Sequence, residues 1–188
     1  MRILWAVNVL LKTFSPLDVR ERLRHLWRMT ILSEDPLGED TKIPTVALWL
    51  GLSGVLPFVL GVLLIAFDGF GRIDPHLSKT ILLAYGAVIL SFLGGARWGL
   101  ALRDPSVGNL GMILAFSTVP PLVGWVALLP PMIYGLPLLV IGFLVQGLWD
   151  IKAMQAGAGP AWYGSLRRIL SIIVTSILAA TWIGLYLI

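Results

Sequence analysis

The chain has 188 residues, of which 57% are hydrophobic and 13% are charged, and its mean hydropathy is +0.89. A soluble domain carries about 25% charged residues, so this composition excludes a protein whose whole exterior faces water. The net charge of +4 reflects basic loops, and we expect no nucleic-acid partner. The absence of cysteine excludes disulfides and thiolate metal sites, and two distant histidines, His25 and His76, do not predict a metal site.

The first 43 residues form a cytoplasmic basic segment that differs from the rest of the chain. Residues 15–29, SPLDVRERLRHLWRM, predict an amphipathic helix, because Arg20, Arg24 and Arg28 fall on one arc and Trp27 falls on the opposite one. These four residues are predicted to contact an anionic membrane surface. The same pattern fits a helix that covers the protein's own cytoplasmic face, and an organellar transit peptide is a further alternative.

Residues 44–188 are predicted to form an all-α bundle of five transmembrane helices. Each needs about 20 apolar residues to cross the hydrocarbon core. The stretches that qualify are about 44–67, 80–102, 107–129, 132–149 and 169–188. The third and fourth are divided at LPPMIYGLP (residues 129–137), and Pro120 with Pro121 predicts a kink within the third. A four-span arrangement, with the proline-rich segment as a re-entrant hairpin, is the alternative.

Basic residues are distributed unevenly between the two sides of this bundle. Twelve Lys and Arg residues fall in the N-terminal segment and in the second and fourth loops, against Arg72 and Lys79 on the other side. The positive-inside rule therefore predicts a cytoplasmic N-terminus and a periplasmic C-terminus. We expect a multi-pass protein of the cell inner membrane.

Two spans carry a small residue at every fourth position. The positions are Ala87, Ser91, Gly95 and Gly99 in the second span and Ser176, Ala180 and Gly184 in the fifth. Residues four apart share a helical face, and small residues let helices approach closely in lipid. We predict that these faces pack helices together, with the second span against the fifth. A groove for a ligand or for a partner helix is the other use of such a face.

Arg97 and Asp150 are predicted at the cytoplasmic ends of the second and fourth spans, at a similar depth. An ion pair between them would fix the order of the helices or form one wall of a polar site, and Gln146 is placed to join it. The alternative for Arg97 is a side chain that reaches out to the lipid headgroups.

The sequence contains no recognisable catalytic set. It has no G-x-S-x-G turn and no glycine-rich phosphate loop after a strand. No span carries an acidic residue at its centre, which argues against a proton-driven carrier. We expect neither an enzyme nor a cofactor.

Three segments together resemble a known family. They are IPTVALWLGLSGVLPFV (residues 43–59), YGAVILSFLGGARWG (residues 85–99) and GPAWYGSLRR (residues 159–168). The family is an uncharacterised five-helix domain of bacterial inner-membrane proteins, a domain of unknown function, and a mitochondrial transmembrane protein of animals is related to it. The resemblance implies the fold and the membrane location, and it assigns no role to any residue.

The small-residue faces and short loops favour a non-enzymatic structural or accessory subunit, or an assembly factor, of a membrane complex. Its expected partners are membrane lipids and other membrane-protein subunits. Eight tryptophans keep open a binding protein for a hydrophobic ligand such as a lipid, pigment or tetrapyrrole. A small transporter is the third class.

Overall fold

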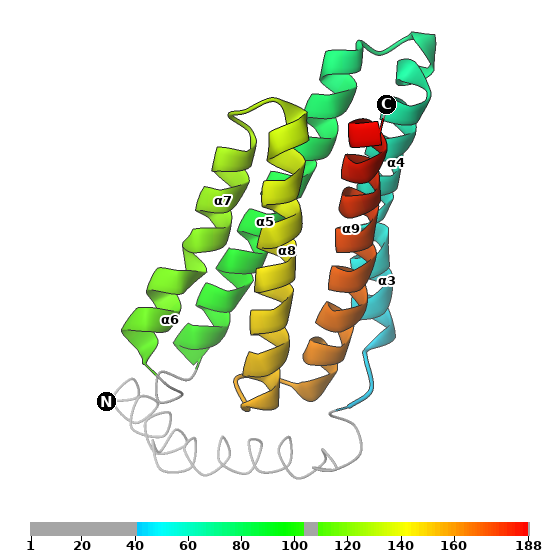
Figure 1. Cartoon of the computed structure of the whole chain (residues 1–188). Helices are drawn as coiled ribbons and strands as arrows, with labels where there is room; N and C mark the ends of the chain where they lie inside the picture. Colours follow the sequence, from blue (N-terminus) through cyan, green and yellow to red (C-terminus); the bar gives the residue numbers. More distant parts are fainter. Residues whose placement is uncertain (1–40, 104–108, 188) are drawn as a thin grey trace, which may run out of the picture. The chain divides into compact units, whose positions relative to one another are not determined.

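The computed structural model describes residues 41–103 and 109–187, which belong to the second of the two units of the chain, Thr41–Ile188 (Figure 1). The helices are α3 (Thr45–Ser53), α4 (Leu56–Ala66), the 3-10 turn η1 (Asp68–Gly71), α5 (Pro75–Arg103), α6 (Leu110–Ser117), α7 (Val119–Ala127), α8 (Met132–Gln155) and α9 (Ala161–Leu187). Because α3 with α4 and α6 with α7 each form one broken span, five spans are long and apolar enough to cross a membrane. The described residues contain no strand. The predicted all-α bundle of five transmembrane helices is confirmed.

The predicted membrane-surface residues Arg20, Arg24, Trp27 and Arg28 lie outside the described residues. The amphipathic N-terminal helix therefore stays a prediction.

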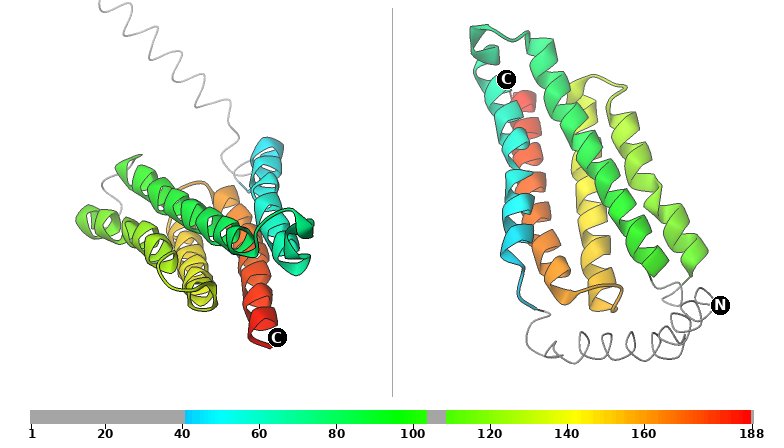
Figure 2. Two further views of the ribbon diagram at one scale, coloured as in Figure 1. Left: turned by 90° about the horizontal axis from the view of Figure 1, so that it is seen from above. Right: turned by 180° about the vertical axis from the view of Figure 1, so that it is seen from behind.

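Helices α5 and α8 form the centre of the bundle, because α5 packs against α4, α6, α7 and α8, and α8 packs against α5, α7 and α9 (Figures 1 and 2). Helices α6 and α7 lie along α5 and α8 on one side, while α3 and α4 lie along α9 on the other. The core between them is apolar, and Phe58 is fully buried with its ring edge-on to Tyr85 and Phe143, at centroid distances of 4.9 and 5.8 Å. Many large apolar side chains face outward, as expected where lipid is the solvent.

Two backbone carbonyls left free inside spans are satisfied by aromatic side chains from other helices. Pro137 lies within α8 and has no amide hydrogen for the Ile133 carbonyl. The indole nitrogen of Trp182 on α9 donates to that carbonyl at 3.0 Å. At the break between α3 and α4, the Tyr85 hydroxyl donates to the Gly54 carbonyl at 2.9 Å. These bonds matter because lipid offers no other donor to a free carbonyl.

The predicted interruption of the third span is confirmed at Thr118, which separates α6 from α7. Pro120 and Pro121 lie in the first turn of α7, and Pro121 supplies no donor for the Ser117 carbonyl. Gly94 of α5 lies against this break. A Cβ atom at Gly94 would come within 2.6 Å of the Ser117 oxygen and 2.8 Å of Pro121 Cδ, so the close approach requires glycine.

The small-residue face predicted on α5 is only partly the face that the bundle uses. Ala87 is buried against Gly124 of α7, and Ser91 is half-buried and donates to the Ala87 carbonyl at 2.8 Å. Gly95 and Gly99 are exposed, and a Cβ at either would have no neighbour within 4 Å. The reason is geometric, since each four-residue step rotates by about 40° around a helix with 3.6 residues per turn. The small residues at every fourth position of α5 therefore turn progressively away from the packed face.

The predicted pairing of the second span with the fifth was wrong. Helix α9 packs mainly against α8, with α4 and α3 as its lesser neighbours. Ser176 and Ala180 of α9 are exposed, and a Cβ at Gly184 would meet open space. The real close approach of α9 is to α8, where Ser171 lies directly against Gly147.

We predict that alanine substitution affects stability differently at two neighbouring glycines of α5. Gly94→Ala should lower the free energy of unfolding by about 1–3 kcal/mol, because the new methyl group meets packed backbone that cannot move away. Gly95→Ala is the matched control and should not destabilise the protein, since its methyl group enters open space. Unfolding midpoints of the detergent-solubilised variants measure both effects. Equal midpoints would contradict the packing described.

Candidate functional site

A buried polar cluster lies near the end of the bundle where α5 and α8 finish and α9 begins. Its members are Arg97 on α5, Gln146 and Asp150 on α8, and Arg167 on α9. None of these residues is more than 5% exposed. Arg97, Asp150 and Arg167 each lie about 8–9 Å inside the end of their helix, at a rise of about 1.5 Å per residue. The cluster is thus enclosed by helices near one membrane surface.

The turn between α8 and α9 brings two parts of this cluster together. Gly157 has a φ of +82°, a left-handed conformation that favours glycine. The Gly157 amide donates to the Met154 carbonyl at 3.1 Å and the Ala158 amide to the Ala153 carbonyl at 3.0 Å, which together close the end of α8 as a Schellman motif. Pro160 then precedes the first residue of α9, so that Arg167 returns alongside Asp150.

Asp150 accepts a hydrogen bond on each of its two carboxylate oxygens. Arg167 Nε donates to Oδ2 at 2.9 Å, and Gln146 Nε2 donates to Oδ1 at 2.9 Å. The partner of Asp150 in this ion pair is therefore Arg167, and the predicted direct pair with Arg97 was wrong. The predicted role of Gln146 beside Asp150 is confirmed.

Arg167 is absent from the predicted site, because the predicted fifth span starts at residue 169 and so leaves Arg167 and Arg168 in the fourth loop. The hydropathy pattern places Arg167 before a fifth span at 169–188, whereas α9 begins at Ala161 and carries Arg167 into the bundle. Pro160 was the available signal, since proline is common in the first positions of a helix.

Arg97 lies close to the ion pair without joining it. Its guanidinium carbon is 4.8 Å from the centroid of the Trp149 ring, a cation–π arrangement. Within the part of the chain that the structure describes, its Nε and Nη1 atoms have no hydrogen-bond partner. Arg97 does not extend out of the bundle toward the surrounding headgroup layer, because it is only 5% exposed. The cluster therefore holds two cations and one anion.

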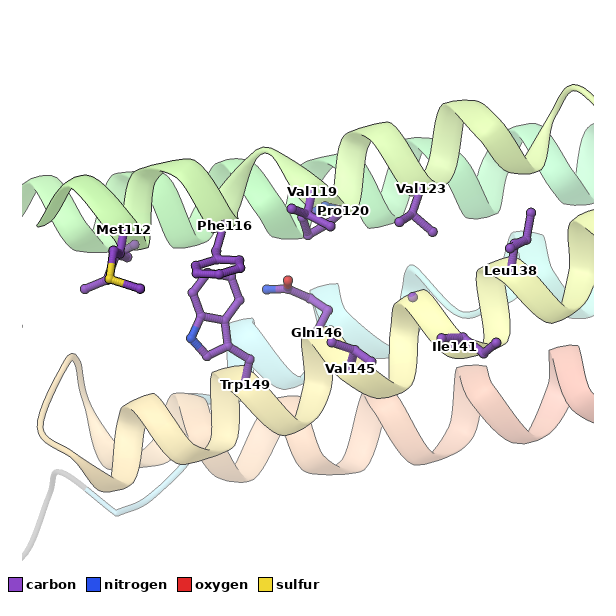
Figure 3. A pocket seen from close by; sticks show the side chains of 12 residues that line it. Met112, Phe116, Val119, Pro120, Val123, Leu138, Ile141, Val145, Gln146 and Trp149 are labelled. Carbon is purple, nitrogen blue, oxygen red and sulfur yellow. The ribbon is translucent and has the colours of Figure 1, made fainter. Parts of the chain in front are cut away.

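An apolar groove, here called the intramembrane groove, lies between α6–α7 and α8 (Figure 3). Its volume is about 530 Å³, and its walls include Pro120 and Val123 on one side and Val145 on the other. Phe116 and Trp149 meet edge-to-face across one end, with centroids 6.3 Å apart. Gln146 projects from α8 into this space, and its Oε1 atom is buried without a hydrogen-bond partner.

A second cavity, here called the Arg97 cavity, adjoins the groove toward the end of the bundle. It has a volume of about 350 Å³ and shares Met112, Ile113 and Trp149 with the groove. Arg97 is the one charged side chain among the described residues that line it. The two spaces together suit a molecule with an apolar body and a polar end.

The groove and the polar cluster lie in a part of the chain that matches a known protein family. Residues 43–183 match the family described as "Protein of unknown function (DUF3429)". The chain is 37% identical over 133 residues to Transmembrane protein 69 of Xenopus tropicalis, covering 69% of this chain and 51% of that protein. It is 40% identical over 87 residues to Transmembrane protein 69 of Mus musculus, covering 46% of this chain and 34% of that protein. The chain thus spans about half or less of these relatives, and no solved structure matches it.

We predict that the coupling energy between Asp150 and Arg167 is larger than that between Asp150 and Arg97. Asp150→Asn leaves buried guanidinium charge without its counter-charge and should cost about 3–5 kcal/mol of folding stability. Adding Arg167→Gln should recover part of this loss, whereas adding Arg97→Gln should recover less. Unfolding midpoints of the single and double variants in detergent give the two coupling energies. A larger coupling to Arg97 would contradict the observed pairing.

Proposed function

Given that the chain belongs to the family described as "Protein of unknown function (DUF3429)", we propose that it is a non-enzymatic membrane protein that binds a hydrophobic ligand in the intramembrane groove. The resemblance to a five-helix domain of unknown function is confirmed by this membership, and the related animal protein is named as a transmembrane protein. The chain is a multi-pass membrane protein.

The observation that carries the proposal is an apolar groove of ligand size with one polar side chain, Gln146, on its wall. Asp150 holds the Gln146 amide nitrogen, so the Gln146 Oε1 atom is left as the acceptor beside the groove. Ligand pockets have volumes of about 300–1,000 Å³ and combine apolar walls with a few fixed polar groups. The groove has this size and this lining. A molecule with a largely apolar body fits it.

The placement of charge supports binding over transport. Asp150, Arg167 and Arg97 gather near one end of the bundle, while carriers place ionisable residues near the middle of the membrane. The sides of the bundle that face lipid are apolar, and the groove is bounded by two of its spans. We therefore favour a ligand that enters from the bilayer.

A second candidate function, an accessory subunit or assembly factor of a membrane complex, is favoured by one observation. Gly95 and Gly99 form an open, exposed G-x-x-x-G face on α5 that no other part of the described chain covers. Such a face lets a helix of another membrane protein approach closely. Its partner would be a membrane-protein subunit.

We further propose an inner-membrane location, with the cluster end of the bundle in the cytoplasm. Among the described residues, six Lys and Arg side chains belong to that end and two to the other. The six are Lys42, Arg97, Arg103, Lys152, Arg167 and Arg168, and the two are Arg72 and Lys79. The positive-inside rule assigns the more basic end to the cytoplasm.

Filling the groove should remove the bound ligand. We predict that protein purified in a mild detergent carries a hydrophobic small molecule, detected by mass spectrometry of a solvent extract, and that Val145→Phe loses it. Leu148→Phe is the matched control, because Leu148 is on the same helix and similarly exposed but does not line the groove. Equal ligand content in both variants would overturn the proposal. A stoichiometric protein partner that Gly95→Leu releases would favour the accessory role instead.

Reporter fusions test the orientation. A reporter that is active only in the periplasm should be active at the C-terminus and inactive when fused after Gly157, between α8 and α9. A reporter that works only in the cytoplasm should give the reverse pattern. Cytoplasmic activity at the C-terminus would contradict the proposed orientation.

A further inference from the structure

The charge of Arg97 has no matching acceptor in the described chain. Asp150 is already bound on both oxygens, by Arg167 and Gln146, and two guanidinium nitrogens of Arg97 have no acceptor. Arg97 is 95% buried, so bulk water does not supply those acceptors freely. A buried charged donor without a partner is costly. Among the described residues Arg97 therefore has no anionic acceptor, and the site can take one from a ligand.

The space beside Arg97 can hold such an acceptor. The Arg97 cavity has a volume of about 350 Å³, and no carboxylate belongs to the described residues that line it. It shares a wall of Met112, Ile113 and Trp149 with the larger apolar groove. An anionic group beside Arg97 would thus be continuous with an apolar region, which is the chemistry of an acidic amphiphile.

The depth of Arg97 indicates which acidic amphiphile fits. Helix α5 has 29 residues, which corresponds to about 43 Å. That length matches a bilayer with its headgroup layers, about 40–45 Å, around a hydrocarbon core of about 30 Å. Arg97 is six residues from the end of α5, about 9 Å inward, and so lies near the boundary between headgroups and acyl chains. A phospholipid presents its phosphate just above this boundary.

We propose that the ligand is an anionic phospholipid, with its phosphate bound by Arg97 and an acyl chain in the intramembrane groove. This inference rests on the proposed function and names the class of its ligand. Arg97 lines the cavity, and its guanidinium donates to phosphate oxygens, which arginine binds well because its charge is fixed and its donors are planar. The Trp149 ring contacts the guanidinium at 4.8 Å and also lines the groove, so it lies between the phosphate and the acyl chain.

Native mass spectrometry of the full chain in mild detergent tests the proposal. Phosphatidylglycerol and phosphatidylcholine with identical acyl chains are added at equal concentration, and the retained lipid is counted. The wild type should retain phosphatidylglycerol preferentially. Arg97→Gln should lower this preference about tenfold, the loss expected for one charge-assisted bond. Arg97→Lys should restore part of it.

Arg103→Gln is the matched control. Arg103 is a basic residue of the same helix, nearer to the same end, but it is exposed and does not line the Arg97 cavity. Its loss should leave the preference intact. An equal loss in Arg103→Gln would mean that general surface charge selects the lipid, and it would overturn the assignment to Arg97. Unfolding midpoints of both variants exclude misfolding as the cause of a change.

The outcomes separate this inference from the proposed function. The wild type could retain both lipids equally, with Val145→Phe losing both and Arg97→Gln retaining both. In that case the groove binds a ligand and the phosphate assignment is wrong. If Val145→Phe changes nothing for either lipid, the groove is not the binding site and both proposals fail. Displacement of the lipid by inorganic phosphate alone, or a polypeptide mass in place of the lipid, would also overturn the assignment.

Discussion

The bundle is organised around the ion pair between Asp150 and Arg167. In the low-dielectric interior of a membrane protein, a lone carboxylate is costly, so Asp150 needs both donors that it receives. One comes from α9 and the other from one turn earlier on α8. This arrangement fixes how the last hairpin folds, and it also determines the electrostatics next to it. Each oxygen of Asp150 already accepts from another side chain, and Arg97 forms no ion pair with it at contact distance.

Ion pairs of this kind can cost more in desolvation than they return, so the pair is weak support for stability alone. Its structural effect is clearer. The same bond that occupies Asp150 orients the Gln146 amide, and the orientation of that amide leaves an acceptor beside the groove. Folding and the binding chemistry are therefore linked through a single carboxylate. A change at Asp150 alters the site even where it leaves the helices in place.

The backbone is under a parallel constraint, because lipid cannot satisfy a carbonyl that proline has freed. The broken third span shows how the constraint shapes the site. Its break at Thr118 places Pro120 and Val123 on the wall of the groove, and Gly94 packs against the break from the far side. A straight helix would not offer the same wall. Pro120 is thus both part of the break and part of the wall of the groove.

Composition and hydropathy were enough to predict five spans, because the need for about 20 apolar residues is a strong constraint. The ends of the spans were less predictable. Hydropathy places a boundary at a charge, but Arg167 is inside α9 because Asp150 neutralises it. The partner of a charge depends on helix rotation and on neighbours that a single sequence does not show. The prediction that Gly95 and Gly99 pack against another helix was wrong for the same reason, since both lie beyond the arc of α5 that other helices cover.

Helices α8 and α9 are joined by a polar bond near each end. Arg167 holds Asp150 near the loop, and Trp182 holds the Ile133 carbonyl near the other membrane surface, about 25 Å away along α8. Sliding α9 by one helical turn would break both bonds at once and leave a charge and a carbonyl exposed to lipid. The two bonds therefore define the axial register of α8 against α9.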